Sequence, residues 1–457
     1  MTARPFRTLS IIVACFSWAL STAAAQSLLR DAEIELFLED LSTPLLEAAG
    51  LQPEAVSLYL VGDNSLNAFV AGGQNIFIHT GLLTAADTPN QIEGVIAHEI
   101  GHIAGGHLQR GADVMATASR PVLLSLVLGA AAIAAGAPPE AGIAISGLGQ
   151  RVALGDILAH SRGQEASADQ AAVTYLEATG QSGQGLVEFF GKLANRQLAS
   201  SRNVDPYLLT HPLAIRRINA LRDKVQGLEH YDSADSEDEI IRLQMIQGKI
   251  LGFMQDPYIT LRTYPLSDKS APARYARAVA YYRKSELERG LKEIDSLIDE
   301  QPDNPYFAEL KGQMLFEHGQ IAESVVPHRR SVALAPGVAL FKINLGRALV
   351  ALEREGDMDE AVEVLKSGLA LEPDNGFGWS ELARAYAALG RDDLASLAQA
   401  QAFFSYGNEA QAHRFATRAS EKLEPGTPEH LQALDIIAAT VETARRARAE
   451  GSPSRMN

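Results

Sequence analysis

The stretch TPNQIEGVIAHEIGHIAGGH, residues 88–107, decides the fold of the N-terminal half of the chain. Thr88 is a good N-cap, and Pro89 suits the first helical position. Gln91 stands where it would complete a capping box with Thr88. Apolar residues follow at helical spacing. The pattern predicts a helix that begins after Thr88 and carries the motif HEIGH.

HEIGH is the H-E-x-x-H pattern of zinc peptidases. His98 and His102 lie one helical turn apart, so both imidazoles can reach one Zn²⁺ at about 2.0–2.1 Å. Glu99 lies beside them and is suited to act as a general base. The alternative is a pair of ordinary helical histidines. The helix start at Thr88 argues against it, because it places the motif in the context that the mechanism needs.

A catalytic zinc also needs a third protein ligand and an open position. His107 is five residues after His102, whereas the metzincin pattern requires six, so we expect His107 to be a packing or supporting residue. A carboxylate from a later helix is the other usual solution. The segment EASAD supplies Glu165 as the third ligand, and Asp169, one turn on, would orient a ligand histidine. Alone, the two acids would read as an exposed pair; with HEIGH they predict one Zn²⁺ per chain.

The rest of the N-terminal half mixes short strands with helices. Three β-rich runs at 57–62, 67–72 and 75–81 are separated by turn residues, which predicts a small antiparallel meander. A further helix is expected over 156–179. The prediction is an α+β zincin-like metalloprotease domain over 26–230, mostly helical with a small antiparallel sheet.

The first 25 residues have the layout of a secretory signal peptide. Basic residues precede an apolar run, and small residues end at Ala25, where cleavage is expected. A second interpretation is a lipoprotein box that ends at Cys15; both imply export. Cys15 is the only cysteine, so cleavage after Ala25 leaves a mature chain without thiols. Histidines and carboxylates must then hold any metal.

No charged residue occurs between Pro121 and Pro139, and the apolar character continues to residue 150. Alanine, glycine and proline make a membrane span a poor interpretation, so we expect 121–150 to be a lid or an interfacial hairpin at a membrane surface. A single span would also separate His102 from Glu165. The net charge of −16 argues against nucleic acid as a partner.

The C-terminal half has an internal period. Pro302, Pro336 and Pro373 each close one helix and open the next, 34 and then 37 residues apart, with an insertion expected around 353–357. This is the tetratricopeptide period, and it predicts an all-α solenoid; the alternative is an irregular helical bundle. The expected parts are a linker and connecting helix over 231–268, repeats over 269–425, and a capping helix with a tail over 426–457.

Four phrases in this order, NAFVAGGQNIFIHTGLL, AHEIGHIAGGH, EASAD and THPLAIRRI, together resemble the M48 metallopeptidases. The resemblance implies a zinc endopeptidase with His98, His102 and Glu165 as ligands and Glu99 as the general base.

The same resemblance implies roles for three more residues. His211 would either sit on the zinc and hold the enzyme latent, or move to help stabilise the transition state. Arg217, six residues later, would anchor this loop through a carboxylate pair. Asn67 would lie on a strand beside the cleft, where an extended substrate adds as a β-strand.

An export signal in front and repeats behind extend what the resemblance implies. The chain is expected in the periplasm, with peripheral membrane contact through 121–150. It would degrade misfolded or stalled outer-membrane β-barrel proteins and support their assembly, and its repeats would recruit these substrates or the assembly machinery. The rival interpretation is a chaperone or assembly scaffold with latent proteolysis.

Overall fold

The computed structural model describes residues 28–107, 161–199, 207, 211, 215–354 and 356–450. The expected signal peptide and the expected lid at 121–150 lie outside the described residues. The chain divides into two compact units: residues 34–247 form the core of the first, while residues 31–33 and 248–457 belong to the second. Within the described part, no helix has the length and apolarity needed to cross a membrane.

The sheet of the first unit has four strands in the order β1-β2-β4-β3. These are β1 (Leu28–Leu29), β2 (Ser57–Val61), β3 (Ala68–Ala71) and β4 (Asn75–His79). β3 pairs with β4 in antiparallel orientation, but β2 pairs with β4 in parallel orientation. The predicted antiparallel meander is therefore wrong, and the sheet is mixed.

The loop after β2 causes this topology. The Asp63 carbonyl accepts hydrogen bonds from the Gly81 amide at 2.8 Å and from the Thr80 hydroxyl at 2.9 Å. The Asn67 carbonyl accepts from the His79 amide at 2.9 Å. The loop thus passes over the end of β4, and β4 fills the space between β2 and β3. As a result, β3 lies at the edge of the sheet.

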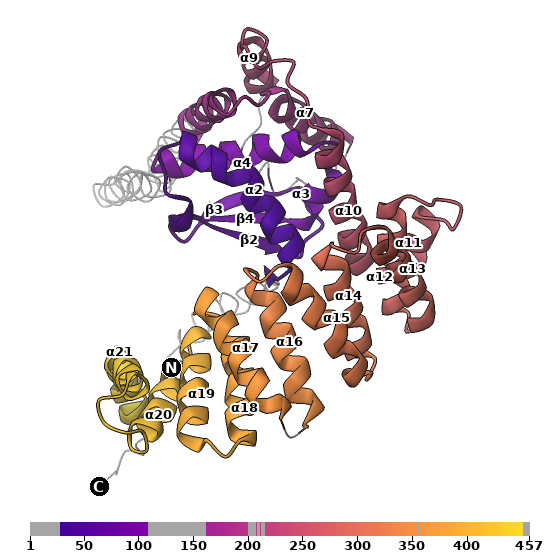
Figure 1. Cartoon of the computed structure of the whole chain (residues 1–457). Coiled ribbons are helices and arrows are strands. Elements are labelled where there is room, and N and C mark those ends of the chain that lie inside the picture. The colour runs from indigo at the N-terminus through magenta and orange to yellow at the C-terminus, as the bar shows by residue number, and fades with distance from the viewer. Residues whose placement is uncertain are drawn as a thin grey trace, which may run out of the picture. The chain divides into compact units, whose positions relative to one another are not determined.

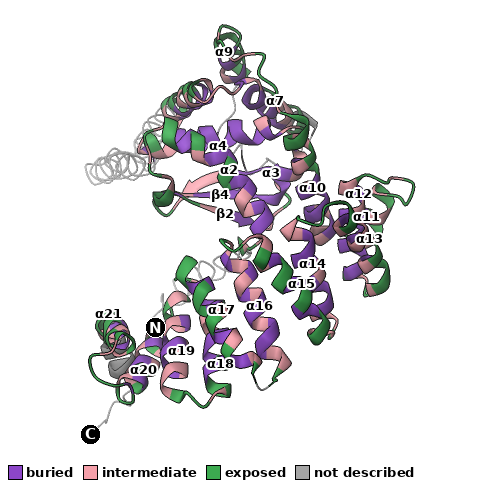
Figure 2. Cartoon of the chain, viewed as in Figure 1, coloured by how far each residue is buried: buried purple, intermediate pink, exposed green. Residues whose placement is uncertain are grey.

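Helices pack around this sheet, and α4 (Pro89–Ala104) is the most central of them. It contacts both β3 and α7 (Gln184–Ala199; Figure 1), and Figure 2 shows it largely buried. The helix expected over 156–179 is present across its described part, residues 161–178. Further described helices of this unit are α2 (Ala32–Ala48), α3 (Thr80–Ala85) and α9 (Ile215–Val225).

α4 begins at Pro89 as predicted, but the predicted capping box is wrong. The Thr88 side chain makes no cap hydrogen bond. Instead, the Asn90 amide donates to both Asp235 carboxylate oxygens, at 3.1 and 3.2 Å, and the Gln91 side chain accepts from the Asp87 amide at 3.0 Å. A carboxylate also complements the positive end of the helix dipole, so Asp235 takes over the role expected of Thr88.

The close approach of α4 to α7 depends on Gly94. A Cβ atom at this position would lie 2.7 Å from the Leu186 backbone nitrogen. We expect Gly94→Ala to lower the free energy of unfolding by about 1–3 kcal/mol, because the helices must move apart. Gly191→Ala is the matched control on α7, where a Cβ atom meets nothing within 4 Å. It should instead raise stability by up to about 1 kcal/mol. Calorimetric unfolding of both variants measures the difference.

A buried carboxyl near the start of α4 predicts a pH effect. Burial raises the pKa of Glu93 to about 7, and the neighbouring Asp235 and Glu239 raise it further, against hydrogen bonds from Asn90 and Gln181. Between about pH 4.3 and the folded-state pKa, the folded chain binds more protons here than the unfolded chain. The free energy of unfolding should therefore fall as pH rises through this window.

In Glu93→Gln, the decrease in the free energy of unfolding with rising pH should be smaller, by at most about 3 kcal/mol. Denaturant titrations at pH 5 and pH 8 measure it. An unchanged profile in the variant would mean that Glu93 stays ionised in the folded protein.

The second unit is built of helical hairpins, which confirms the predicted solenoid. Each hairpin packs on the next. The first helices of successive hairpins start 34, 34, 37 and 33 residues apart. The pairs are α12 (Ala271–Arg283) with α13 (Leu287–Glu300), α14 (Pro305–Glu317) with α15 (Ile321–Leu334), α16 (Ala339–Leu352) with α17 (Asp357–Leu371), α18 (Gly376–Ala388) with α19 (Asp392–Ser405), and α20 (Glu409–Ser420) with α21 (Pro428–Glu450).

The third hairpin carries its three extra residues around 353–357, as expected, at the end of α16, in the turn and at the start of α17. α16 has 14 residues and α17 has 15, against 13 and 14 in the fourth hairpin. The turn between them is also one residue longer.

The segment expected as a linker holds α10 (Glu237–Met254) and α11 (Pro257–Thr263), and the two units divide within α10. The expected domain boundaries stay a prediction.

Residues 31–33 complete the core of the second unit. The Lys249 ammonium lies 2.7 Å from the Asp31 carboxylate and 3.1 Å from Glu33, and the Tyr275 hydroxyl donates to Glu33 at 2.8 Å. Lys249 and Glu33 are only 3% and 4% exposed. Losing one partner of such a pair typically costs about 3–5 kcal/mol, so this cluster holds the N-terminal segment firmly in the second unit.

Candidate metal centre

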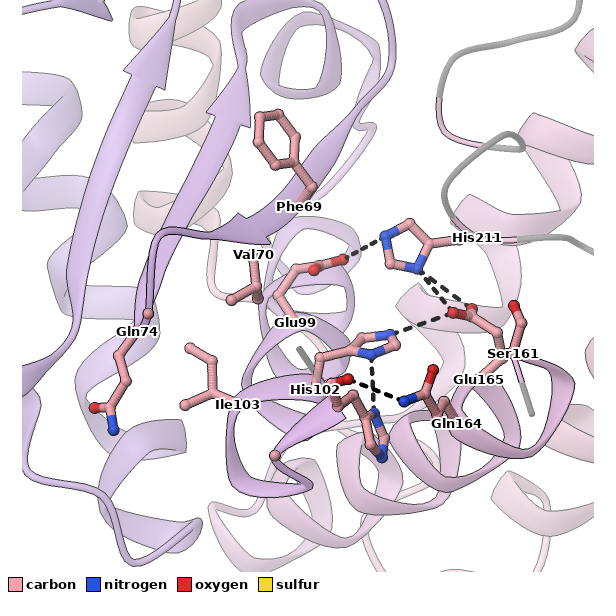
Figure 3. Close-up of a pocket in the computed structure, with 13 residues that line it drawn as sticks. Phe69, Val70, Gln74, Glu99, His102, Ile103, Ser161, Gln164, Glu165 and His211 are labelled. Atoms are coloured by element: carbon pink, nitrogen blue, oxygen red, sulfur yellow. Dashed lines mark hydrogen bonds and ion pairs between the residues drawn. The ribbon is translucent and has the colours of Figure 1, made fainter. Parts of the chain in front are cut away.

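Four side chains from three separate parts of the chain converge beside β3. His98 and His102 come from α4, Glu165 from the helix at 161–178, and His211 from the segment before α9. Their ligand atoms all lie within 4.8 Å of one another. Figure 3 shows His102, Glu165 and His211 pointing toward one point. The sequence analysis expected the first three as ligands and gave a place on the zinc as one of two roles for His211; in the structure all four lie in one group.

The spacing of these donors fits a zinc ion. The Nε2 atoms of His98 and His102 are 3.1 Å apart, and Glu165 lies 3.4 Å from His102 and 3.2 Å from His211 Nδ1. Bonds of about 2.0–2.1 Å to a tetrahedral zinc place neighbouring ligands about 3.4 Å apart. Three imidazoles and one carboxylate are also donors that zinc accepts, whereas calcium and magnesium prefer oxygen alone.

The two α4 histidines are oriented through their second ring nitrogens. His98 Nδ1 lies 3.0 Å from the Asp169 carboxylate, and His102 Nδ1 lies 2.9 Å from His107 Nδ1. Both rings therefore present Nε2 to the centre, and such partners also set the tautomer. His107 lies outside the four-donor group, as its spacing led us to expect.

Arg217, on α9, connects the carboxylates of the centre. Two of its nitrogens donate to Asp169 at 2.8 Å each, and a third lies 2.8 Å from Glu165. Burial opposes ionisation of Asp169, but hydrogen bonds from Arg217 and His98 lower the pKa of this carboxyl. Glu165 also has a lowered pKa, because His211 and His98 outweigh its burial. Both carboxylates are thus ionised, as a cation site requires.

The two α4 histidines differ in charge preference. Burial, with the nearby His98, lowers the pKa of His102 to about 2, so its ring is neutral and ready to bind a metal. Burial also disfavours charge on His98, but Asp169 and Glu165 raise the pKa of this ring to about 9. A cation bound between the same carboxylates would replace that proton.

Glu99 is fully buried, and it faces His211 rather than the other donors. Burial raises the pKa of its carboxyl, which suits a group that must accept a proton. His211 Nε2 lies 3.5 Å from Glu99, while His211 Nδ1 lies 3.2 Å from Glu165. The Tyr207 ring stacks on His211 with 4.6 Å between ring centroids. The His211 ring therefore lies between the carboxylates of Glu165 and Glu99.

A cavity of about 240 Å³ opens onto the centre between β3 and the helix at 161–178. Phe69 and Val70 line it from β3, and Gln74 lines it from the turn that follows (Figure 3). Asn67 precedes β3 and is 5% exposed, and it is not among the residues that line the cavity. Sequence reasoning missed the lining residues from β3, since only the strand order reveals that β3 is an edge.

Comparison with known proteins agrees with this geometry. The model of peptidase family M48 matches the chain from residue 29 to residue 225. Residues 29–225 are an M48 peptidase domain. The M48 domain contains the whole four-donor group, and the chain is therefore a metallopeptidase.

Curated relatives extend beyond the M48 domain. The chain is 26% identical to the "Beta-barrel assembly-enhancing protease" of Yersinia pestis, over 89% of this chain and 83% of that protein. The protein of the same name from Escherichia coli strain K12 is 24% identical, over 88% and 81%. "Metalloprotease LoiP" of the same strain is 32% identical over 38% of this chain and 64% of its own length. Among solved structures, a crystal structure of MamA is 16% identical and matches 38% of this chain and 96% of the MamA chain. Its TM-score is 0.29.

Proposed function

We propose that the chain is a periplasmic zinc endopeptidase that degrades misfolded or stalled outer-membrane β-barrel proteins and supports their assembly. The observation that carries this proposal is the convergence of His98, His102 and Glu165 beside the buried Glu99. The names of the long relatives support the substrate class.

Five residues have distinct tasks in this proposal. His98, His102 and Glu165 would hold the zinc, which supplies Lewis-acid polarisation of the scissile carbonyl and of water when it is bound. Glu99 takes the proton of the attacking water and passes it to the leaving amine. Asp169 keeps His98 in its ligand orientation. Because the site is already arranged in this way, it does not have to reorganise during the reaction.

Among the described residues β3 pairs on one side only, and its other side suits an extended substrate. An edge strand leaves backbone N–H and C=O groups unpaired, and a peptide can add to it as a further strand. Phe69 and Val70 place this edge along the cavity that contains Glu99 and Glu165. A bound strand would therefore run past the catalytic groups. Unassembled strands of β-barrel proteins have this extended, unpaired form.

The helical repeats supply the recruitment step. Stacked helical hairpins form extended binding surfaces in repeat proteins. We propose that this solenoid binds substrates or the outer-membrane assembly machinery, so that specificity comes from docking as well as from the cleft.

Metal removal tests the enzymatic proposal. A strong zinc chelator should abolish cleavage of an unfolded outer-membrane barrel by the purified chain, and one equivalent of Zn²⁺ should restore it. Magnesium should not, because two of the proposed ligands are imidazoles. Elemental analysis should find one zinc per chain, and none in His98→Ala. Cleavage that persists in the chelated chain would overturn the proposal.

The second candidate is an assembly scaffold with latent proteolysis. It is favoured by His211, whose ring lies between Glu165 and Glu99. Expression of Glu99→Gln in a strain that lacks the protein distinguishes the two. Full restoration of outer-membrane assembly by this variant would favour the scaffold, whereas persistent assembly defects would favour the peptidase.

A further inference from the structure

The first helical hairpin of the solenoid holds a second cavity, of about 520 Å³. This volume falls within the range of about 300–1,000 Å³ that is usual for ligand sites. Five cationic side chains but only two carboxylates line it. The whole chain has a net charge of −16, so an excess of cations around one cavity is the opposite of the average charge of the protein. The cations are Lys269, Arg274, Arg277, Arg289 and Lys292, and the carboxylates are Glu293 and Glu300.

Two of the arginines are structural. Arg277 is 1% exposed and donates to Glu293 at 2.9 and 3.1 Å, and also to the Pro265 carbonyl at 2.9 Å. Arg274 donates to Glu300 at 2.7 Å. Each carboxylate in the cavity wall is thus neutralised by an arginine.

The other three cations of the cavity have no carboxylate of the cavity wall as a partner. Lys269 and Lys292 are exposed, and neither has an ion pair among the described residues. The acid next to Lys269, Asp268, accepts from the Ser270 amide at 3.0 Å, and the acid next to Lys292, Glu293, accepts from Arg277 at 2.9 Å. Arg289 lies over the Tyr281 ring at 4.0 Å, and its one ion pair is with Glu286. A ligand that enters the cavity meets mainly the two lysines.

From this charge surplus we propose that the cavity binds an acidic peptide segment of a partner protein. Peptide carboxylates would pair with the ammonium groups of Lys269 and Lys292, and an apolar side chain would contact Leu266, which is 55% exposed at the cavity wall. Phosphate groups are best bound by free arginine forks, and the forks of Arg274 and Arg277 are already occupied. The inference does not depend on the proposed peptidase function.

Fluorescence anisotropy with the full chain tests the proposal. The probe is a fluorescein-labelled peptide of alternating glutamate and leucine, and the same peptide with glutamine is its uncharged counterpart. We expect the glutamate peptide to bind and the glutamine peptide to bind at least tenfold more weakly. The double variant Lys269→Glu with Lys292→Glu should weaken glutamate-peptide binding by at least tenfold. Added salt should also weaken it, because the contacts are exposed to solvent.

A matched control separates the cavity from overall charge. The double variant Lys224→Glu with Lys366→Glu changes two exposed lysines elsewhere by the same charge, and it should alter the dissociation constant less than twofold. Equal weakening by both double variants would overturn the proposal, as would unchanged binding in the cavity variant. Binding of phosphatidylglycerol vesicles without binding of the glutamate peptide would also overturn it, and would indicate an anionic lipid surface. Because no cleavage is measured, any of these failures would leave the proposed peptidase function standing.

Discussion

Glutamine in place of Glu99 is expected to lower the rate of peptide cleavage by about 10²–10⁴-fold, the usual contribution of a general base. The substitution keeps the size of the side chain but removes its ability to accept the proton of water. Glu99 lies outside the four-donor group, so the zinc content should stay at one per chain. Initial rates on an unfolded outer-membrane protein and elemental analysis of the same sample measure both quantities.

His102→Ala is the matched comparison for this experiment. It removes one of the four donors, so it should lose zinc together with activity. The two variants thus separate loss of the base from loss of the metal. A Glu99→Gln enzyme that cleaves at the wild-type rate would show that another group accepts the proton.

Alanine in place of His211 should raise cleavage of a misfolded substrate by about tenfold. His211 contacts Glu165 through one nitrogen and faces Glu99 through the other, so its ring lies between the two carboxylates; we call this conformation the closed state. Stacking on Tyr207 adds to the closed state. If the closed state is favoured by about 1.4 kcal/mol, about a tenth of the molecules are open. Loss of the His211 contacts would leave all molecules open, which raises the rate about tenfold.

The direction of the change decides what His211 does. Lower activity in His211→Ala would favour a role in stabilising the transition state, and unchanged activity would argue against a latch. His107→Ala is a useful comparison because His107 contacts His102 without belonging to the four donors. It loosens a supporting contact and is expected to lower cleavage rather than raise it.

The local parts of the fold could be predicted from the sequence. The start of α4 and the hairpins of the solenoid follow from nearby residues, namely Pro89 and the recurrent prolines. The order of the strands could not be predicted, because it depends on hydrogen bonds from the Asp63 carbonyl to residues at the end of β4. The cap of α4 was missed for a similar reason, since Asp235 lies 145 residues after Asn90.

The candidate centre shows the same division. Motif spacing brought out His98, His102 and Glu165, because each belongs to a short recognisable phrase. Spacing alone does not show that His211 Nε2 faces Glu99. The placement of Asn67 beside the cleft rested on a strand whose position in the sheet was unknown, and the cavity is lined instead by the residues that follow it.

The burial of Asp31 and Glu33 against Lys249 has a consequence for the order of synthesis. More than two hundred residues separate these acids from their cationic partner, so they leave the ribosome long before it. The two acids therefore wait for their cationic partner until the whole peptidase domain has been made. A solenoid expressed alone from residue 248 would carry Lys249 without its carboxylates. An isolated solenoid should therefore fold better when residues 31–33 are supplied as a separate peptide.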